Sequence, residues 1–221
     1  MPRASQSKHA RIVLVDDHPL VRERLAEMLN REPDLRVCGE AEDRQGALSV
    51  IATSKPDLAI VDLTLKDSHG LDLIKDIQAR WPALAVLVVS MHEESLHAER
   101  AIRAGARGYI TKQEATRKIL LAVRRVLEGG IYLSDAIAAQ LAPKAVGRGD
   151  APAGVSLEHL ADRELEVLQW IGRGYSTHEI AERLGLNFKT VETYRARIKD
   201  KLGLKDAHEV LQYAIRWHYN L

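Results

Sequence analysis

Hydrophobic and polar positions over residues 10–128 alternate between short apolar runs and longer segments with helical spacing. Runs in which every residue is apolar, such as Ile12–Val15 and Val86–Val89, fit strands that are buried on both faces of a sheet. The predicted strands are Arg11–Val15, Arg36–Ala41, Leu58–Val61, Ala85–Val89 and Arg107–Ile110. The predicted helices are Pro19–Asn30, Gln45–Thr53, Leu71–Arg80, Ser95–Ala104 and Glu114–Leu127. A βα unit repeated in this way predicts a five-stranded parallel sheet covered by helices on both faces.

The pattern changes beyond this segment. Residues 142–155 hold two prolines and three glycines with few large apolar side chains, which is typical of a linker. The helices predicted after it are Asp162–Gly172, Ser176–Leu184, Phe188–Leu202 and Ala207–Trp217. Ser176 with Glu179 forms a capping-box pattern, and Asn187 is a good N-cap for the third helix. Because Gly185 separates the second and third helices by only a few residues, the pair is typical of a helix-turn-helix.

These patterns predict a disordered N-terminus over residues 1–9 and an α/β domain over residues 10–128. A connecting segment and linker follow over residues 129–155, and an all-α domain of four helices occupies residues 156–221. The length of 221 residues is compatible with two domains.

Composition excludes several classes of protein. The formal net charge is +1, so any nucleic-acid site must be a local patch. Cys38 is the only cysteine, which excludes an intrachain disulfide and a cysteine zinc cluster. Apolar runs are far shorter than a membrane span, and residues 1–10 lack the apolar core of a signal peptide. We therefore expect a cytoplasmic protein without a membrane partner.

Polar side chains are predicted to gather at one edge of the sheet. Asp16 and Asp17 follow the first strand and Asp62 follows the third, and open α/β sheets bind ligands at the carboxyl ends of their strands. Ser90 and Lys112 follow two further strands. Crowded carboxylates raise one another's pKa, and a hard cation such as Mg2+ relieves that cost with its preference for oxygen ligands. A hydroxyl and an ammonium facing three carboxylates favour a site for a transferred phosphoryl group.

Four sequence blocks carry a resemblance to a known family. They are VDDHP (15–19), VDLTLKDSHG (61–70), VVSMH (88–92) and GYITK (108–112). In these blocks, residues 10–128 resemble the flavodoxin-like receiver domain of two-component response regulators. The resemblance implies that Asp62 accepts a phosphoryl group from a phosphohistidine of a sensor histidine kinase.

The same resemblance assigns roles to other residues of this edge. It implies that Asp17, Asp62 and the backbone carbonyl of Thr64 hold Mg2+, while Asp16 acts partly through water. It also implies a switch pair, in which Ser90 moves toward the phosphoryl group and Tyr109 rotates into the vacated space. Taken alone, Ser90 could equally be an ordinary residue at a strand end, and Tyr109 a half-buried packing residue.

The third helix of the C-terminal domain has the character of a DNA-recognition helix. Val191, Ile198 and Leu202 recur at helical spacing and are predicted to face the core. Residues 189–201 carry five basic side chains against two acidic ones, although residues 156–221 as a whole balance ten against ten. Charge alone would fit a solvated amphipathic helix. The tight turn before this helix and its small, polar outer face instead favour a helix lying in a major groove.

The C-terminal half resembles a LuxR-type DNA-binding domain in four sequence blocks. They are RELEVL (163–168), EIAERL (179–184), KTVETY (189–194) and KLGL (201–204). Both halves together resemble the NarL/FixJ subgroup of response regulators. The resemblance assigns Lys189, Glu192 and Thr193 to base contacts, with Ala196 beside them. It assigns phosphate contacts to Thr190, Tyr194, Arg195 and Arg197. Glu192 stands where many relatives carry lysine, so the operator sequence cannot be transferred from them.

The prediction is a DNA-binding transcriptional regulator, not an enzyme, in which phosphorylation controls homodimer formation and exposure of the recognition helix. Tyr213 and Trp217 on the last helix are candidates for the dimer surface. One alternative is a haloacid-dehalogenase-like, Mg2+-dependent phosphatase. That class needs two aspartates in a DxD spacing, whereas Asp16 and Asp17 are adjacent, and it leaves the helix-turn-helix unexplained. Another alternative is a degenerate receiver that serves only as a dimerisation module.

Overall fold

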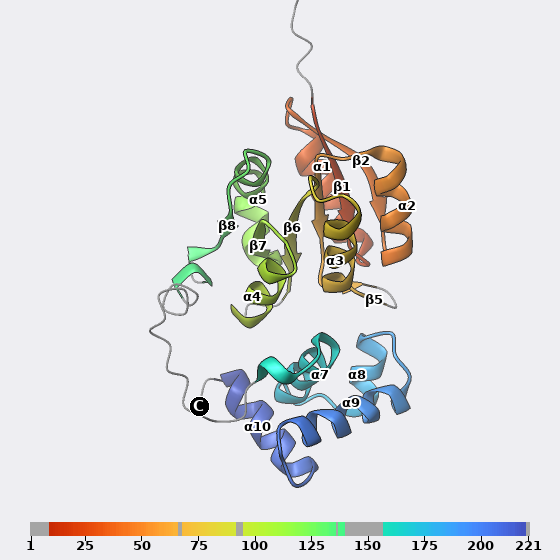
Figure 1. Cartoon of the computed structure of the whole chain (residues 1–221), viewed down its shortest axis with the longest axis vertical. Helices are drawn as coiled ribbons and strands as arrows, with labels where there is room; N and C mark the ends of the chain where they lie inside the picture. The colour runs from red at the N-terminus through yellow and green to blue at the C-terminus, as the bar shows by residue number, and fades with distance from the viewer. Residues whose placement is uncertain (1–8, 66–67, 92–94, 136, 140–156, 220–221) are drawn as a thin grey trace, which may run out of the picture. The chain divides into compact units, whose positions relative to one another are not determined.

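The computed structural model describes residues 9–65, 68–91, 95–135, 137–139 and 157–219 (Figure 1). The chain divides into two units, residues 1–149 and 150–221. Residues 1–8 of the predicted N-terminal segment and residues 140–155 of the predicted linker lie outside the described residues. The four-segment division of the chain therefore stays a prediction. Among the described helices, none is both long and apolar enough to cross a membrane.

A parallel sheet of six strands forms the centre of the first unit, in the order β2-β1-β3-β6-β7-β8. The strands are β1 (Ala10–Val15), β2 (Leu35–Ala41), β3 (Leu58–Val61), β6 (Ala85–Ser90), β7 (Gly108–Thr111) and β8 (Tyr132–Leu133). The first five are the predicted strands, with ends that agree to within one residue. Their order places the chain's first strand between the second and third, which is the doubly wound arrangement.

The sixth strand, β8, corrects the predicted count of five. It consists of Tyr132–Leu133, which pair in parallel with Gly108 and Tyr109 of β7. Two residues cannot display the alternation by which a strand is recognised in a sequence. The segment after α5 therefore looked like a plain connection, although it extends the sheet at one edge.

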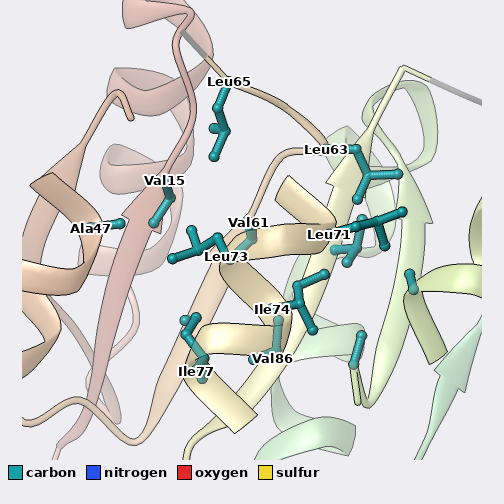
Figure 2. Close-up of a cluster of buried hydrophobic side chains, with 14 of the residues drawn as sticks. Val15, Ala47, Val61, Leu63, Leu65, Leu71, Leu73, Ile74, Ile77 and Val86 are labelled. Carbon is teal, nitrogen blue, oxygen red and sulfur yellow. The ribbon is translucent and has the colours of Figure 1, made fainter. Parts of the chain in front are cut away.

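Helices cover both faces of the sheet, as predicted. They are α1 (Pro19–Asn30), α2 (Arg44–Ser54), α3 (Gly70–Arg80), α4 (Ser95–Arg103) and α5 (Lys112–Leu127). Alternate strand residues point to opposite faces, so Val13 and Val15 pack with α2, α3 and α4, whereas Ile12 and Leu14 pack with α1 and α5. Figure 2 shows part of the first cluster, in which Leu73, Ile74 and Ile77 of α3 lie over β3 and β6.

A small hairpin connects β3 to α3. Its strands β4 (Thr64–Leu65) and β5 (Ser68–His69) pair antiparallel and return the chain to the end of β3. Gly70 then begins α3 with its N–H donated to the carbonyl of Leu63, at 2.7 Å. A Cβ on Gly70 would lie 2.1 Å from the carbonyl oxygen of Asp62, so only glycine allows this approach. The packing explains the glycine at the end of the VDLTLKDSHG block.

The second unit consists of helices around a small core. They are η1 (Leu157–His159), α7 (Asp162–Gly172), α8 (Thr177–Arg183), α9 (Phe188–Lys201) and α10 (Ala207–Tyr219). Ser176 and Asn187 cap α8 and α9 through their side chains, as predicted. Gly185 has φ +62° in the turn between these helices, a backbone conformation that suits glycine. Val191 and Ile198 of α9 and Leu202 directly after it are fully buried, which confirms the predicted core face.

Candidate functional sites

The register of the central strands brings the predicted acidic residues together. Val15 lies opposite Val61, so β1 and β3 end side by side. The N–H of Asp62 donates to the carbonyl of Val15 at 2.8 Å, and the N–H of Asp16 donates to Ala41 of β2 at 3.1 Å. Both aspartates are 3% exposed. Their carboxylates therefore share a largely buried position at the carboxyl end of the sheet.

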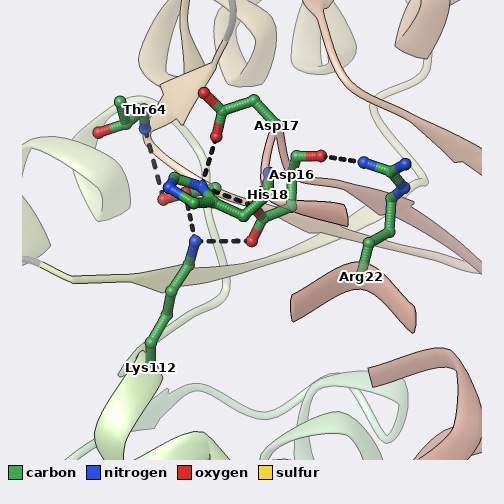
Figure 3. Close-up of polar contacts among 7 residues, drawn as sticks. Asp16, Asp17, His18, Arg22, Thr64 and Lys112 are labelled. Atoms are coloured by element: carbon green, nitrogen blue, oxygen red, sulfur yellow. Dashed lines mark hydrogen bonds and ion pairs between the residues drawn. The ribbon is translucent and has the colours of Figure 1, made fainter. Parts of the chain in front are cut away.

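Lys112 joins these two carboxylates. Its Nζ lies 2.7 Å from Asp16 Oδ2 and 2.7 Å from Asp62 Oδ2 (Figure 3). Lys112 is the first residue of α5 and directly follows β7, so its side chain reaches the site from a third strand end. With 8% of the side chain exposed, the ammonium is shielded from solvent and interacts strongly with both aspartates.

The buried site shifts the pKa values of its groups. Burial, together with the neighbouring Asp16, raises the pKa of Asp62 to about 7 even though Lys112 favours the ionised form. Burial alone would lower the pKa of the Lys112 ammonium, but the carboxylates of Asp62 and Asp16 outweigh it and raise that pKa. The site thus contains more negative charge than one lysine balances, and an additional cation would stabilise it.

Asp17 and His18 complete this rim. His18 Nδ1 lies 2.7 Å from Asp17 Oδ1 and 3.3 Å from Asp16 Oδ1. Ligand atoms of Asp16, Asp17, His18 and Asp62 all lie within 4.8 Å of one another. Three carboxylates form a donor set that fits Mg2+, which prefers oxygen. His18 is a further neighbour, to which the sequence motifs gave no role.

The backbone of Thr64 also contacts the site. Its N–H donates to Asp62 Oδ1 at 3.4 Å, so the turn after β3 supports the carboxylate from the backbone. The role of the Thr64 carbonyl as a metal ligand stays a prediction.

Ser90 and Tyr109 lie on the neighbouring strands β6 and β7. Ser90 ends β6 instead of following it, and its side chain is fully buried. Tyr109 is also fully buried, within the cluster that packs against α3 and α4, where a half-buried aromatic was one expectation. Strand pairing sets Ser90 opposite Thr111, two residues beyond Tyr109. Their action as a switch pair stays a prediction.

The predicted recognition helix α9 presents a polar face. Lys189, Glu192, Thr193, Ala196 and Arg197 are exposed. The other predicted DNA contacts, Thr190, Tyr194 and Arg195, are half-buried. Several side chains that could contact bases or phosphates are therefore accessible on one helix, as binding in a major groove requires.

Glu192 has partners within its own domain. Its Oε1 accepts a hydrogen bond from the hydroxyl of Thr177 on α8 at 2.9 Å and lies 3.7 Å from Arg195 Nε. The contact with Thr177 joins the two helices of the helix-turn-helix. Sequence spacing could suggest the pair with Arg195, one helical turn away, but not the pair with Thr177. The contact of Glu192 with a DNA base stays a prediction.

Comparisons with known proteins agree with both halves of this description. Residues 12–124 match the family described as "Response regulator receiver domain", and residues 158–214 match "Bacterial regulatory proteins, luxR family". The chain is also 33% identical over 210 residues to the oxygen regulatory protein NreC of Staphylococcus aureus and of Staphylococcus haemolyticus. Those alignments cover 93% of this chain and 97% of the relative.

Solved structures show a similar fold. A LuxR-family two-component response regulator from Aurantimonas sp. SI85-9A1 is 35% identical, with a TM-score of 0.60, over 63% of this chain and 99% of that one. RcsB from Salmonella enterica serovar Typhimurium, solved bound to promoter P1flhDC in the presence of the phosphomimetic BeF3-, is 24% identical, with a TM-score of 0.62. That match covers 94% of this chain and 98% of RcsB.

Proposed function

This chain belongs to the NarL/FixJ-type response regulators, which join a receiver domain to a LuxR-type DNA-binding domain, and we propose that phosphorylation of Asp62 controls its binding to promoter DNA. The phosphoryl donor would be a phosphohistidine of a cognate sensor histidine kinase. We place the receiver at residues 10–128 and the DNA-binding domain at residues 156–221. A regulator of promoters would act in the cytoplasm.

The observation that carries this proposal is the position of Lys112 between Asp62 and Asp16. Lys112 Nζ lies 2.7 Å from each carboxylate, at the edge where three strands end. In the transfer, an oxygen of the ionised Asp62 attacks the phosphorus atom, and the bond from phosphorus to the imidazole nitrogen breaks with its electron pair on nitrogen. Lys112 is placed to pair with a phosphoryl oxygen once Asp62 is esterified.

The carboxylates also fit a cation. Asp17 and Asp62, with the Thr64 carbonyl and Asp16 nearby, would hold Mg2+. Bound Mg2+ would supply positive charge against the crowded carboxylates and the incoming phosphoryl oxygens. His18 contacts the carboxylates of both Asp16 and Asp17. Its ring would have to move before their oxygens could turn toward an ion.

The proposed output is a homodimer on DNA. Paired half-sites in an operator require two-fold symmetry in the bound protein. On α10, Tyr213 and Trp217 are half-buried and provide aromatic surface for a second copy. In the receiver, Ser90 and Tyr109 would transmit the change at Asp62 to the surface. Lys189, Glu192 and Thr193 would contact bases, while Arg195 and Arg197 would contact phosphates.

Labelling with a small phosphodonor tests the site directly. After incubation with Mg2+, peptide mass spectrometry should find one added phosphoryl group, on Asp62, and EDTA should prevent the reaction. Asp62→Asn should abolish it. Asp57→Asn is the matched control, because Asp57 precedes the same strand at the opposite edge of the sheet and accepts the N–H of Arg11. Undiminished labelling of Asp62→Asn would reject Asp62 as the acceptor, and no labelling of the wild type would favour a degenerate receiver.

A further inference from the structure

Arg22 of α1 holds the turn that carries the first two carboxylates of the acidic rim. Its Nη1 donates to the backbone carbonyl of Asp16 at 2.6 Å (Figure 3). Its own backbone N–H donates to the carbonyl of His18 at 3.1 Å. The arginine therefore contacts both ends of the segment that contains Asp17, without contacting a carboxylate of the site.

A second residue fixes the guanidinium in this position. Arg22 Nε donates to Glu40 Oε2 at 3.0 Å, and Glu40 lies on β2, next to β1 in the sheet. The side chain of Arg22 is 18% exposed. The N–H of Asp16 also donates to Ala41 on β2. The turn is thus held between α1 on one side and β2 on the other.

The bonded carbonyl matters because it belongs to the peptide unit between Asp16 and Asp17. That unit is planar, so its orientation sets how the two residues project relative to each other. If the hydrogen bond from Arg22 is lost, the peptide plane can rotate and the two carboxylates no longer converge reliably. Groups that orient metal ligands in this indirect way contribute strongly to metal affinity in proteins.

We propose that Arg22, anchored by Glu40, is a positioning residue for the divalent-cation site formed by Asp16, Asp17 and Asp62. This inference rests on the proposed function, in which that site holds Mg2+. Arg22 would act through the backbone of Asp16 and not by its charge alone. Lysine keeps the charge but cannot bond Asp16 and Glu40 with the planar fork of a guanidinium.

The test is a titration of the full chain with Mg2+, monitored through the backbone amide signals by NMR. These signals report both the dissociation constant and the integrity of the fold. Arg22→Ala should raise the dissociation constant about tenfold or more, as is usual for groups that orient metal ligands. Arg22→Lys should recover only a minor part of this loss. Glu40→Ala should weaken binding in the same direction and provides a second variant if Arg22→Ala fails to fold.

Arg24→Ala is the matched control. Arg24 lies on the same helix, is 57% exposed and pairs with Glu27, so its loss removes equal charge without touching the turn. Its dissociation constant should stay within about twofold of the wild type. The positioning role would be overturned if Arg22→Ala and Glu40→Ala bound Mg2+ as tightly as Arg24→Ala does. Full recovery of Mg2+ affinity in Arg22→Lys would overturn it as well. A wild type that binds no Mg2+ would instead overturn the proposed function, and this inference with it.

Discussion

The ionised carboxylate of Asp62 opposes folding when no cation is bound. Its pKa rises from 3.8 to about 7 on folding, first because of burial and then because of Asp16. Between these two pH values, the Asp62 carboxyl therefore keeps its proton in the folded protein but loses it in the unfolded chain. The stabilisation that comes with this proton is complete at low pH and is lost as pH rises toward about 7. In the proposed function, a bound cation would offset the cost of ionising Asp62 in the folded protein.

Replacing this residue should therefore stabilise the metal-free protein in a pH-dependent way. In EDTA, Asp62→Asn should have a free energy of unfolding about 1–3 kcal/mol above that of the wild type at about pH 8, and the gap should shrink toward about pH 5. Urea denaturation of the two proteins at these pH values measures the gap. A gap that stays constant or widens toward low pH would show that Asp62 does not titrate as described.

Two side chains of α9 should affect DNA binding differently. Glu192→Ala should relax base preference at one operator position and cost about 1–3 kcal/mol if Glu192 contacts a base. Arg197→Ala should weaken all sequences alike and reduce the salt slope by about one unit, as expected for one phosphate contact. The measurement is binding to a library of operator variants at several salt concentrations.

Thr177→Val provides the matching test for Glu192. Valine keeps the shape of threonine but removes the hydroxyl that donates to Glu192 at 2.9 Å. If this bond orients Glu192 toward a base, the valine variant should relax preference at the same operator position. Unchanged base preference in both Glu192→Ala and Thr177→Val would make Glu192 a structural link between α8 and α9.

At the scale of elements, regular periodic segments could be predicted from the sequence, and so could the meeting of residues that follow parallel strands. The five longer strands and the nine predicted α-helices rest on apolar spacing and end within two residues of prediction. The convergence of Asp16, Asp62 and Lys112 followed from their places at strand ends. The short strand β8 could not be predicted, because two residues are too few to show an alternating pattern.

The contacts that escaped prediction are set by side-chain packing. Arg22 reaches Asp16 because α1 folds back over the end of β1, and no spacing rule describes that hydrogen bond. Glu164 on α7 is another case. It accepts from the N–H of Ala161, where the sequence offers no capping side chain, and also binds Lys201 of α9 at 2.6 Å. Such contacts depend on how elements meet, which a single sequence does not display.

The hairpin between β3 and α3 should depend on the glycine at its end. Gly70→Ala places a Cβ 2.1 Å from the carbonyl of Asp62, so the end of β3 or the start of α3 must move. We expect a loss of about 1–3 kcal/mol in the free energy of unfolding, together with slower labelling of Asp62. Thermal unfolding and the phosphodonor assay measure these effects.

Gly46→Ala is the control for this change. A Cβ on Gly46 of α2 would lie 3.4 Å from Asp43 Oδ1, and alanine favours a helix over glycine. This variant should be as stable as the wild type or more so, and it should accept the label normally. Equal behaviour of the two alanine variants would mean that the close approach at Gly70 is not needed by the site.

At the scale of the whole molecule, the chain combines a receiver domain with a LuxR-type DNA-binding domain. Its formal net charge of +1 gives little general attraction to nucleic acid. In the proposed function, affinity for DNA comes from the local basic surface of α9 and from pairing of two copies. The central proposal is that phosphorylation of Asp62 changes the affinity of the chain for DNA.

The most direct test of that claim measures the affinity of the full chain for an operator, first selected from random duplex DNA with phosphodonor and Mg2+ present. Fluorescence anisotropy would then compare the wild type and Asp62→Asn, each with and without phosphodonor. We expect phosphodonor to tighten wild-type binding by about tenfold, within the usual range of coupling between two sites, and to leave Asp62→Asn unchanged. A wild-type affinity that does not respond, or an equal gain in Asp62→Asn, would contradict control of DNA binding through Asp62.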